Sequence, residues 1–279
     1  MSWETMMEAR LQRRVQRYGW DRAAAHYEAH WMTQLRPCHE RMLAMAALRP
    51  GESVIELACG TGLVTFAAAA AVGPTGRVRA TDISGEMVAA ARELATARGI
   101  ANIEFDRMDA EQVAASAARF DIGLCALGLM YFPDPEDALA QLCRVLRPGG
   151  RVTVSVWGRR DRCGWADIFP IVDARVETEV CPLFFRLGAH GALARAFEAA
   201  GLTGFREERI DAELRYSDDQ DACAAAFLGG PVALAYGRFD AATRAAVNSE
   251  YLASIDRFRH GPGYSVPGEF VIATGRVPN

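Results

Sequence analysis

Short apolar runs alternate with amphipathic stretches from residue 53 to residue 157. The runs at 53–58, 77–81, 103–108, 120–126 and 151–157 predict five strands, and the stretches at 62–72, 85–98, 111–117 and 135–146 predict helices between them. Strands that alternate with helices pair in parallel and are covered on both faces. The pattern therefore predicts an α/β fold with a mostly parallel sheet flanked by helices.

The chain before and after this region follows other patterns. In the first fifty residues Trp20, Tyr27 and Trp31 recur at helical spacing, which predicts a helical cover with an aromatic face. After residue 157 the alternation stops, and a helix at 189–200 and strands at 205–216 and 264–276 complete a seven-stranded sheet. We expect an N-terminal helical cover at 1–50 and one domain at 51–279, with lid insertions at about 160–188 and 218–258.

Composition and charge argue against several classes of protein. The 279 residues carry 31 basic and 35 acidic side chains, a net charge of −4, so the basic face of a nucleic-acid-binding protein is not expected. No apolar run approaches the roughly 18 residues of a membrane span, and charges interrupt the N-terminal segment where a secretory signal would be apolar. We therefore expect a cytoplasmic protein without a membrane span.

Cysteine and histidine positions do not indicate a metal site. The seven cysteines form no CxxC pair, which also argues against a disulfide framework. Among the five histidines, His26 and His30 share a helix face but have no third ligand.

The oligomeric state is not fixed by these patterns, and the sequence is compatible with a homodimer.

A glycine-rich turn follows the first predicted strand. Gly60 and Gly62 let the backbone turn sharply and approach a ligand at the start of the next helix. Asp82 lies 20 residues beyond Gly62, at the end of the second strand, where a carboxylate can accept hydrogen bonds from both ribose hydroxyls of a nucleoside. Glu56 precedes the turn and suits a cationic amino group rather than a pyrophosphate. Position 65 is Thr65, so the third glycine of the dinucleotide fingerprint is absent.

Five segments in this order resemble the motifs of class I S-adenosylmethionine-dependent methyltransferases. They are the segment 54–62, Asp82, Asp109-Ala110-Glu111, Phe120-Asp121 and the segment 146–151, within a match that covers roughly residues 50 to 157. The resemblance implies a Rossmann-like fold, S-adenosylmethionine as cofactor and S-adenosylhomocysteine as product. It also implies methyl transfer by in-line displacement to a small-molecule acceptor, which we expect to be apolar or aromatic.

The resemblance implies which residues bind the cofactor. Gly60 and Gly62 would pack under the methionine portion and the ribose, and Asp82 would bind the ribose diol. Leu127, just past the fourth strand, would offer its backbone to the methionine amino group. The other positions are Glu56, which would orient the site, Ala58 and Thr61, which would line it, Ile83 and Met87, which would flank the adenine, and Asp109 and Ala110, which would meet the adenine edge.

Within that superfamily the sequence is most similar to the ubiquinone and menaquinone biosynthesis C-methyltransferases. The likeness rests on the segment 82–87 and on the pair Gly128-Leu129. The Arg-Asn that follows this pair in those enzymes is Met130-Tyr131 here, so the polar site residues of quinone methylation are absent at these positions.

The acceptor side is less defined by the sequence. Candidates for a general base or an orienting group are Tyr27, His26, Tyr131 and His190. We expect the acceptor wall beyond the carboxyl ends of the strands, in the segment after Trp157 and in the helices near 227–236. Its aromatic residues, which favour an apolar acceptor or form a packed lid core, are Trp165, Phe169, Phe184, Phe185, Phe227 and Tyr236.

Three other functions are open to an α/β nucleotide-binding protein. A non-catalytic S-adenosylmethionine-binding protein would keep the residues from Glu56 to Asp109 but lack a productive acceptor pocket. A nicotinamide-dependent oxidoreductase would be expected to carry the third glycine that is missing. A nucleic-acid amino-methyltransferase would carry Asn/Asp-Pro-Pro-aromatic after the fourth strand, where Ala126-Leu127-Gly128-Leu129 stands.

Overall fold

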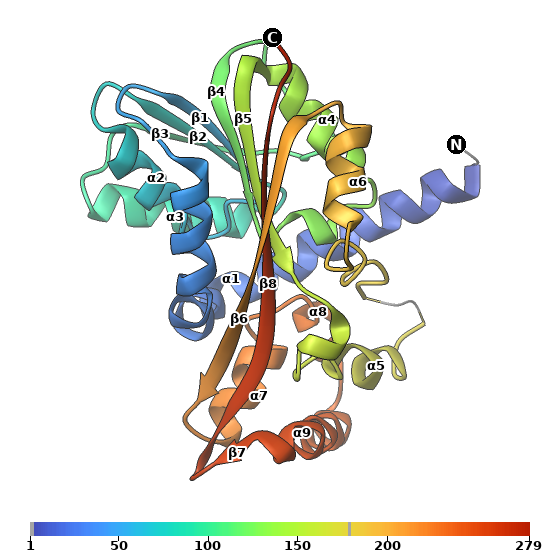
Figure 1. The fold of residues 1–279 in the computed structure, drawn as a ribbon. Coiled ribbons are helices and arrows are strands. Elements are labelled where there is room, and N and C mark those ends of the chain that lie inside the picture. Colours follow the sequence, from blue (N-terminus) through green and yellow to red (C-terminus); the bar gives the residue numbers. More distant parts are fainter. Residues whose placement is uncertain (1–2, 178–179) are drawn as a thin grey trace.

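A mixed sheet runs through the centre of the computed structural model, which describes residues 3–177 and 180–279 (Figure 1). The strand order is β3-β2-β1-β4-β5-β8-β6, and β7 pairs with β8. Strands β1 to β5 pair in parallel, while β8 lies antiparallel between β5 and β6. The predicted mostly parallel sheet is confirmed, and the short β7 adds an eighth strand. The strands are β1 (Ser53–Leu57), β2 (Arg77–Asp82), β3 (Ile103–Arg107), β4 (Phe120–Ala126), β5 (Leu146–Trp157), β6 (Thr203–Tyr216), β7 (Arg259–His260) and β8 (Gly263–Arg276).

Helices flank the sheet, and some of them start at capping side chains supplied by the sequence. Ser84 accepts a hydrogen bond from the backbone N–H of Met87 at the start of α3 (Gly85–Ala97), and Asp134 caps α4 (Pro135–Val145) through the N–H of Asp137. Helix α2 (Thr65–Val72) packs against β1 and β2, whereas α4 packs against β5 and α6 (Ala192–Ala199). The expected layers of an α/β fold are therefore present.

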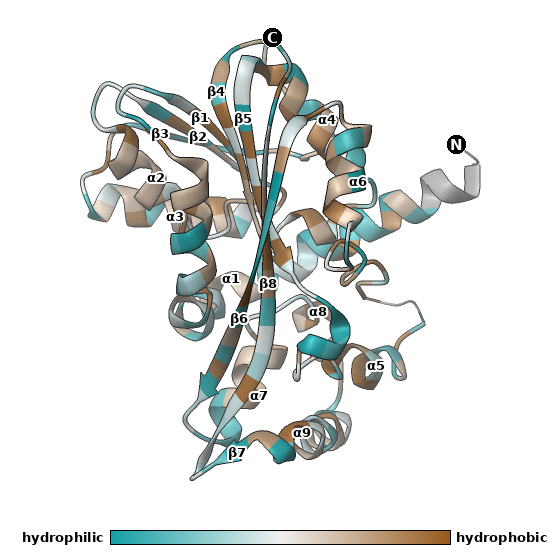
Figure 2. Cartoon of the chain, viewed as in Figure 1, coloured by the Kyte–Doolittle hydropathy of each residue, from teal (hydrophilic) through white to brown (hydrophobic). Residues whose placement is uncertain are grey.

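Burial follows the layers. The side chains of β1, β4 and residues 152–157 of β5 are almost all buried because helices cover both faces of these strands. Figure 2 shows hydrophobic residues along these central strands and hydrophilic residues along the middle of the edge strand β6. Charged residues on an edge strand discourage pairing with another chain.

The N-terminal cover is one long helix, α1 (Trp3–Ala46), of 44 residues. It contacts α3, β5, β8 and α8 (Ala233–Tyr236), so it spans from the first half of the sheet to the C-terminal helices. Figure 1 shows its first turns projecting away from the body of the protein. Helical structure was predicted for this region, and the structure confirms it.

The segment predicted as a helix at 111–117 is a loop, and that prediction was wrong. Its carbonyl oxygens bind arginine side chains instead of helical amides: Arg144 donates to those of Val113 and Ala115, and Arg79 donates to that of Ala114. The guanidinium groups come from neighbouring elements, a contact that local sequence does not reveal.

The lower part of the molecule in Figure 1 surrounds the extended ends of β6 and β8. The helical stretch expected at 218–258 is divided into three helices, because Gly229-Gly230-Pro231 and Gly237 interrupt it. These helices are α7 (Asp219–Phe227), α8 and α9 (Ala241–Ile255), and α5 (Ile168–Asp173) lies in the segment after β5. Short 3-10 turns are η1 (Leu129–Tyr131), η2 (Arg160–Arg162) and η3 (Asp256–Phe258). In the described part of the chain, no helix has the length and apolarity to cross a membrane.

Candidate functional site

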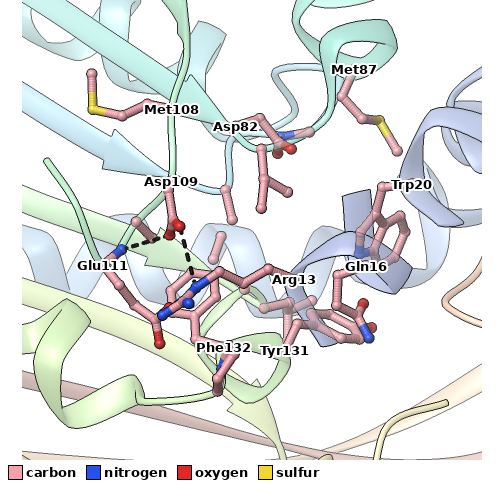
Figure 3. A pocket seen from close by; sticks show the side chains of 18 of the residues that line it. Arg13, Gln16, Trp20, Asp82, Met87, Met108, Asp109, Glu111, Tyr131 and Phe132 are labelled. Carbon is pink, nitrogen blue, oxygen red and sulfur yellow. Dashed lines mark hydrogen bonds and ion pairs between the residues drawn. The ribbon is translucent and has the colours of Figure 1, made fainter. Parts of the chain in front are cut away.

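A cavity of about 710 Å³ lies at the carboxyl ends of β1, β2 and β4. Side chains from α1 close it on one side, as Figure 3 shows for Arg13, Gln16 and Trp20. Parallel α/β sheets place their ligands at this edge. The other lining residues are Tyr27, Ala58, Gly60, Asp82, Ile83, Met87, Met108, Asp109, Ala110, Glu111, Ala126, Leu127, Gly128, Tyr131, Phe132 and Pro133.

The turn after β1 is fixed by the carboxylate of Asp82. Oδ2 of Asp82 accepts a hydrogen bond from the N–H of Gly60 at 2.9 Å, and Oδ1 accepts one from the N–H of Ser84 at 2.9 Å. The side chain is thus held rigidly at the end of β2 and faces the cavity. Its oxygens retain lone pairs for further donors, which is what a vicinal diol offers.

Burial raises the pKa of Asp82 to about 6, against the stabilising effect of its two backbone hydrogen bonds. The carboxyl group therefore titrates close to neutrality. A ligand that donates hydrogen bonds to it favours the ionised form.

Glu56 lies beneath the turn rather than in the cavity wall. It is 1% exposed, and its Oε2 accepts a hydrogen bond from the hydroxyl of Thr65 at 2.6 Å. Burial raises its pKa to about 8. A cationic group bound above the turn would favour ionisation of Glu56.

Two residues that are not glycine have left-handed backbone at the cavity. Ala58 follows β1 with φ 54°, and Leu127 follows β4 with φ 53°. Gly128 packs tightly against both loops, so that a side chain there would not fit. A Cβ on it would lie 2.5 Å from Cβ of Ala58 and 2.9 Å from Sγ of Cys125. Strained backbone of this kind is typical of ligand sites.

An acidic cluster closes the end of the cavity near β3. Arg13 of α1 pairs with Glu111 and lies 3.3 Å from Asp109, and the N–H of Glu111 donates to Asp109 at 3.0 Å (Figure 3). Glu111 also accepts a hydrogen bond from the N–H of Asp134 at the start of α4. Burial raises the pKa of Glu111, and Arg13 opposes that effect. The cluster thereby ties α1 to two loops of the sheet edge.

A second cavity, of about 530 Å³, adjoins the first. Trp20, Tyr27, Leu127 and Tyr131 belong to both linings and so form the shared wall. The second cavity is otherwise lined by Trp31, Leu35, Trp157, Trp165, Ile168, Phe184, Tyr216, Ala226, Gly230, Pro231 and Tyr251.

Aromatic rings in edge contact connect the two cavities. Trp20 contacts Tyr131 with ring centroids 5.1 Å apart, and Tyr131 contacts Phe184 at 5.4 Å. Phe184 in turn contacts Trp165, which packs on Trp157 at 4.8 Å. The second cavity therefore has rigid aromatic walls, suited to a flat apolar ligand.

The tyrosines of the shared wall are neutral. Burial is the main cause that raises the pKa of both Tyr27 and Tyr131, and the charge of Asp82 adds to the effect on Tyr27. Each hydroxyl can donate a hydrogen bond, but neither is predisposed to accept a proton as phenolate. An orienting role suits both residues better than a role as general base.

The structure places most of the expected site residues around the first cavity, but not all of them. The side chains of His26 and His190 are exposed and line neither cavity. Thr61 and Gly62 are buried in the turn behind the wall. The residues that do line the first cavity are Tyr27, Tyr131, Ala58, Gly60, Asp82, Ile83, Met87, Asp109, Ala110 and Leu127.

The structure brings only some of the residues expected in the acceptor wall to a cavity. Trp165 and Phe184 line the second cavity, whereas Phe169, Phe185, Phe227 and Tyr236 lie in neither lining. Sequence reasoning missed Trp31, Leu35, Trp157, Tyr216 and Tyr251 as lining residues, and it missed Arg13 and Gln16 of the first cavity. The position of Trp157 at the end of β5 was a usable signal, because strand ends face the site.

Metal ligation has no support in the described residues. Nowhere in 3–177 or 180–279 do three or more His, Cys, Asp or Glu side chains gather as a cation would require. The seven cysteines are free thiols.

Comparisons with known proteins bear on the same residues. Residues 54–150 match the family model of a methyltransferase domain. Nocamycin O-methyltransferase of Saccharothrix syringae is 30% identical over 277 residues, which cover 92% of this chain and 96% of that protein. A ubiquinone/menaquinone biosynthesis C-methyltransferase of Ectopseudomonas mendocina is 39% identical over 113 residues, but these cover only 40% of this chain and 44% of that protein. The predicted likeness to that group is confirmed.

Solved structures share the fold. The crystal structure of the YcgJ protein of Bacillus subtilis superposes with a TM-score of 0.62 at 17% identity, covering 88% of this chain and 99% of that one. At this identity the likeness concerns the fold alone. Because the superposition covers most of this chain, the shared fold extends well beyond residues 54–150 that match the family model.

Proposed function

Because this chain belongs to the class I S-adenosylmethionine-dependent methyltransferases, we propose that it transfers a methyl group to an oxygen atom of a small, largely apolar metabolite. The observation that carries the proposal is the pair of adjoining cavities. One lies at the strand ends, the other is aromatic, and they share a wall. A donor in one cavity and an acceptor in the other would meet between the four residues that border both.

The first cavity fits the cofactor. Asp82 is held at the end of β2, where it can accept from the ribose hydroxyls, and Glu56 lies beneath the turn, where it can balance a cationic amino group. The pair Ile83 and Met87 would flank the adenine, and Asp109 would meet its edge. When bound, the cofactor supplies a methyl group that is already electrophilic, so the protein mainly aligns the acceptor.

Oxygen is favoured as the methylated atom by the extent of the similarity. Most residues of the second cavity, among them Trp165, Tyr216 and Tyr251, lie outside the segment 54–150 that matches the family model. The relative that aligns over nearly the whole chain is named an O-methyltransferase, whereas the C-methyltransferase relative matches less than half of it. The O-methyltransferase is therefore the better guide to the acceptor side of this chain.

Two measurements test the proposal. Calorimetric titration with S-adenosylhomocysteine should show binding, which Asp82→Ala weakens by more than about tenfold through loss of the diol contact. The exposed Asp211→Ala on β6 is the control and should leave the affinity unchanged. Incubation of the protein with isotope-labelled methyl donor and a metabolite extract should then give a labelled methyl ether or ester. Unchanged affinity in Asp82→Ala, or label found only on carbon or nitrogen, would contradict it.

A further inference from the structure

We propose that the second cavity is the acceptor chamber and that it takes a ring-bearing acid, whose reacting oxygen is already ionised as a carboxylate or an acidic enolate when it binds. This inference rests on the proposed function, because it assigns the acceptor of that reaction. It is carried by the composition of the chamber wall.

The wall offers rings and aliphatic groups but no charge. Four tryptophans line the cavity, Trp20, Trp31, Trp157 and Trp165. In the part of the chain that the structure describes, no Asp, Glu, His, Cys, Arg or Lys side chain belongs to this lining. Stiff aromatic walls favour flat, rigid ligands, which stack or pack edge-on against them.

Within residues 3–177 and 180–279, no group around the chamber is suited to take a proton from the acceptor. Its titratable residues are Tyr27 from α1, Tyr131 from η1, Tyr216 from β6 and Tyr251 from α9, and burial raises the pKa of each. The thiols behind the wall, Cys38 and Cys181, have their pKa raised to about 12 by burial.

Lysine, another common base, does not occur in the sequence, since all 31 basic residues are arginine. The carboxylates whose charges act on the wall are Asp82, which faces the first cavity, and Asp221, which acts on Tyr216 from α7. Neither lines the chamber.

An acceptor that keeps its proton until transfer would leave that proton without a destination. An ionised oxygen removes the problem. The new bond joins this oxygen to the methyl carbon, the bond between sulfur and methyl carbon breaks, and its electron pair stays on sulfur. One negative and one positive charge cancel, and no proton moves.

The same step explains why an anion is tolerated in an apolar chamber. A buried charge without a partner is costly, and the wall supplies none. The partner is the positive charge of the methyl donor across the shared wall of Trp20, Tyr27, Leu127 and Tyr131. Affinity for the acceptor should then depend on the charge in the first cavity.

The chamber can be tested by binding alone, with its four tryptophans as reporters. The probe is 2-naphthoate, and the neutral comparison is 2-naphthalenemethanol, which has the same rings. We expect 2-naphthoate to quench tryptophan fluorescence of the full chain. It should bind at least about tenfold more tightly with the cationic donor analogue sinefungin bound than with neutral S-adenosylhomocysteine. The alcohol should show no such difference.

A filling substitution locates the binding. Ala226→Phe places a ring in the chamber from α7 and should weaken 2-naphthoate by roughly tenfold or more, while Ala246→Phe at an exposed position of α9 should not. If Ala226→Phe fails to fold, Ile168→Phe, which enters the lining from α5, gives the same test. Affinity for S-adenosylhomocysteine should stay within about twofold in these variants, because these side chains do not line the first cavity.

A pH series tests the ionised oxygen. With donor saturating, the midpoint of kcat/KM against pH should shift with the pKa of the acid when acceptors of different acidity are compared. A midpoint common to all of them would reveal a protein base and overturn the inference. The inference would also be overturned if Ala226→Phe and the unsubstituted chain bound 2-naphthoate equally, or if 2-naphthoate caused no quenching, while S-adenosylhomocysteine still bound. Loss of that binding in the unsubstituted chain would instead refute the proposed function.

Discussion

Ala58 and Leu127 adopt the same left-handed backbone conformation, with φ of 54° and 53°, immediately beyond the neighbouring parallel strands β1 and β4. Each such residue costs about 1–3 kcal/mol, because its Cβ crowds the backbone. Both line the first cavity, and Leu127 also lines the second. The strain is thus concentrated where donor and acceptor would meet.

Relief of this strain at position 58 should stabilise the protein. We expect Ala58→Gly to raise the free energy of unfolding by up to about 1 kcal/mol, since glycine accepts positive φ but loses more chain entropy. Ala58→Val should lower it by more than about 2 kcal/mol, because a β-branched side chain is strongly disfavoured there. Urea denaturation measures both changes in the free energy of unfolding, provided that its dependence on urea concentration has the same slope in each variant. The exposed Ala47, with φ 48°, is the control, and Ala47→Gly should stabilise similarly without altering ligand affinity.

Gly128 should be irreplaceable for a steric reason. A Cβ there would lie 2.5 Å from Cβ of Ala58, which no relaxation of a flexible side chain can relieve. We expect Gly128→Ala to weaken S-adenosylhomocysteine binding by at least about tenfold, through displacement of the wall. Gly85→Ala is the matched control, since its Cβ would meet only Cδ of Arg107 at 3.8 Å. Equal affinity in the two variants would show that the loop adapts.

Binding of the nucleoside portion should depend on pH through Asp82. Its pKa of about 6 in the folded protein lies above the ordinary value of 3.8, so the unliganded carboxyl group is protonated below about pH 6. Ribose hydroxyls donate to the ionised form, and affinity should therefore be full above pH 6 and fall roughly tenfold per unit below it. Calorimetry with methylthioadenosine measures this, because that probe has no amino acid portion and does not engage Glu56.

Asp82→Asn serves as the control for the pH series. An amide does not titrate, so the weaker binding of this variant should be level between about pH 5 and about pH 8, a range that extends roughly one unit below and two units above the transition. A decline of the same steepness in this variant would assign the titration to another group, such as Glu111, whose pKa is also raised by burial.

Arg13 should stabilise both the fold and the bound donor. Its partner Glu111 has a side chain that is 2% exposed, so Arg13→Ala leaves a buried carboxylate without its cation. We expect the free energy of unfolding to fall by about 1–2 kcal/mol, less than for a fully buried pair because Arg13 itself is 27% exposed. The double variant with Glu111→Gln should recover part of the loss in a mutant cycle.

A second pair on the same helix provides the comparison. Arg36 and Glu40 are 71% and 72% exposed, and Arg36→Ala should change stability by less than about 0.5 kcal/mol. A loss at Arg13 no larger than that at Arg36 would show that the cluster near β3 does not hold α1 in place.

The central fold could be predicted because local patterns decide it. Strand β4 was expected at its observed bounds, Phe120–Ala126, since an apolar run between breakers has one reasonable interpretation. The lining of the first cavity was partly accessible in the same way, because Gly60 and Asp82 stand at fixed places relative to strand ends. The loop at 111–117 was missed because Arg79 and Arg144 hold it from other elements.

The lining of the second cavity was harder to predict, because its residues come from distant parts of the sequence. Trp31, Tyr216 and Tyr251 come from α1, β6 and α9, which are adjacent only in the folded chain. Aromatic residues in the same region, such as Phe227 and Tyr236, stack on each other at 4.9 Å instead of lining a cavity. Composition identifies aromatic segments, but packing decides which rings border empty space.

Helix α1 contributes Trp20 and Tyr27 to the boundary of both chambers. Whichever molecule enters first therefore sets the position of a surface that the second must contact. Any coupling between two ligands that contact the same side chains is reciprocal, so that each changes the affinity of the other by the same factor. Substitutions on this face of α1 should accordingly change the affinity for both ligands, not for one alone.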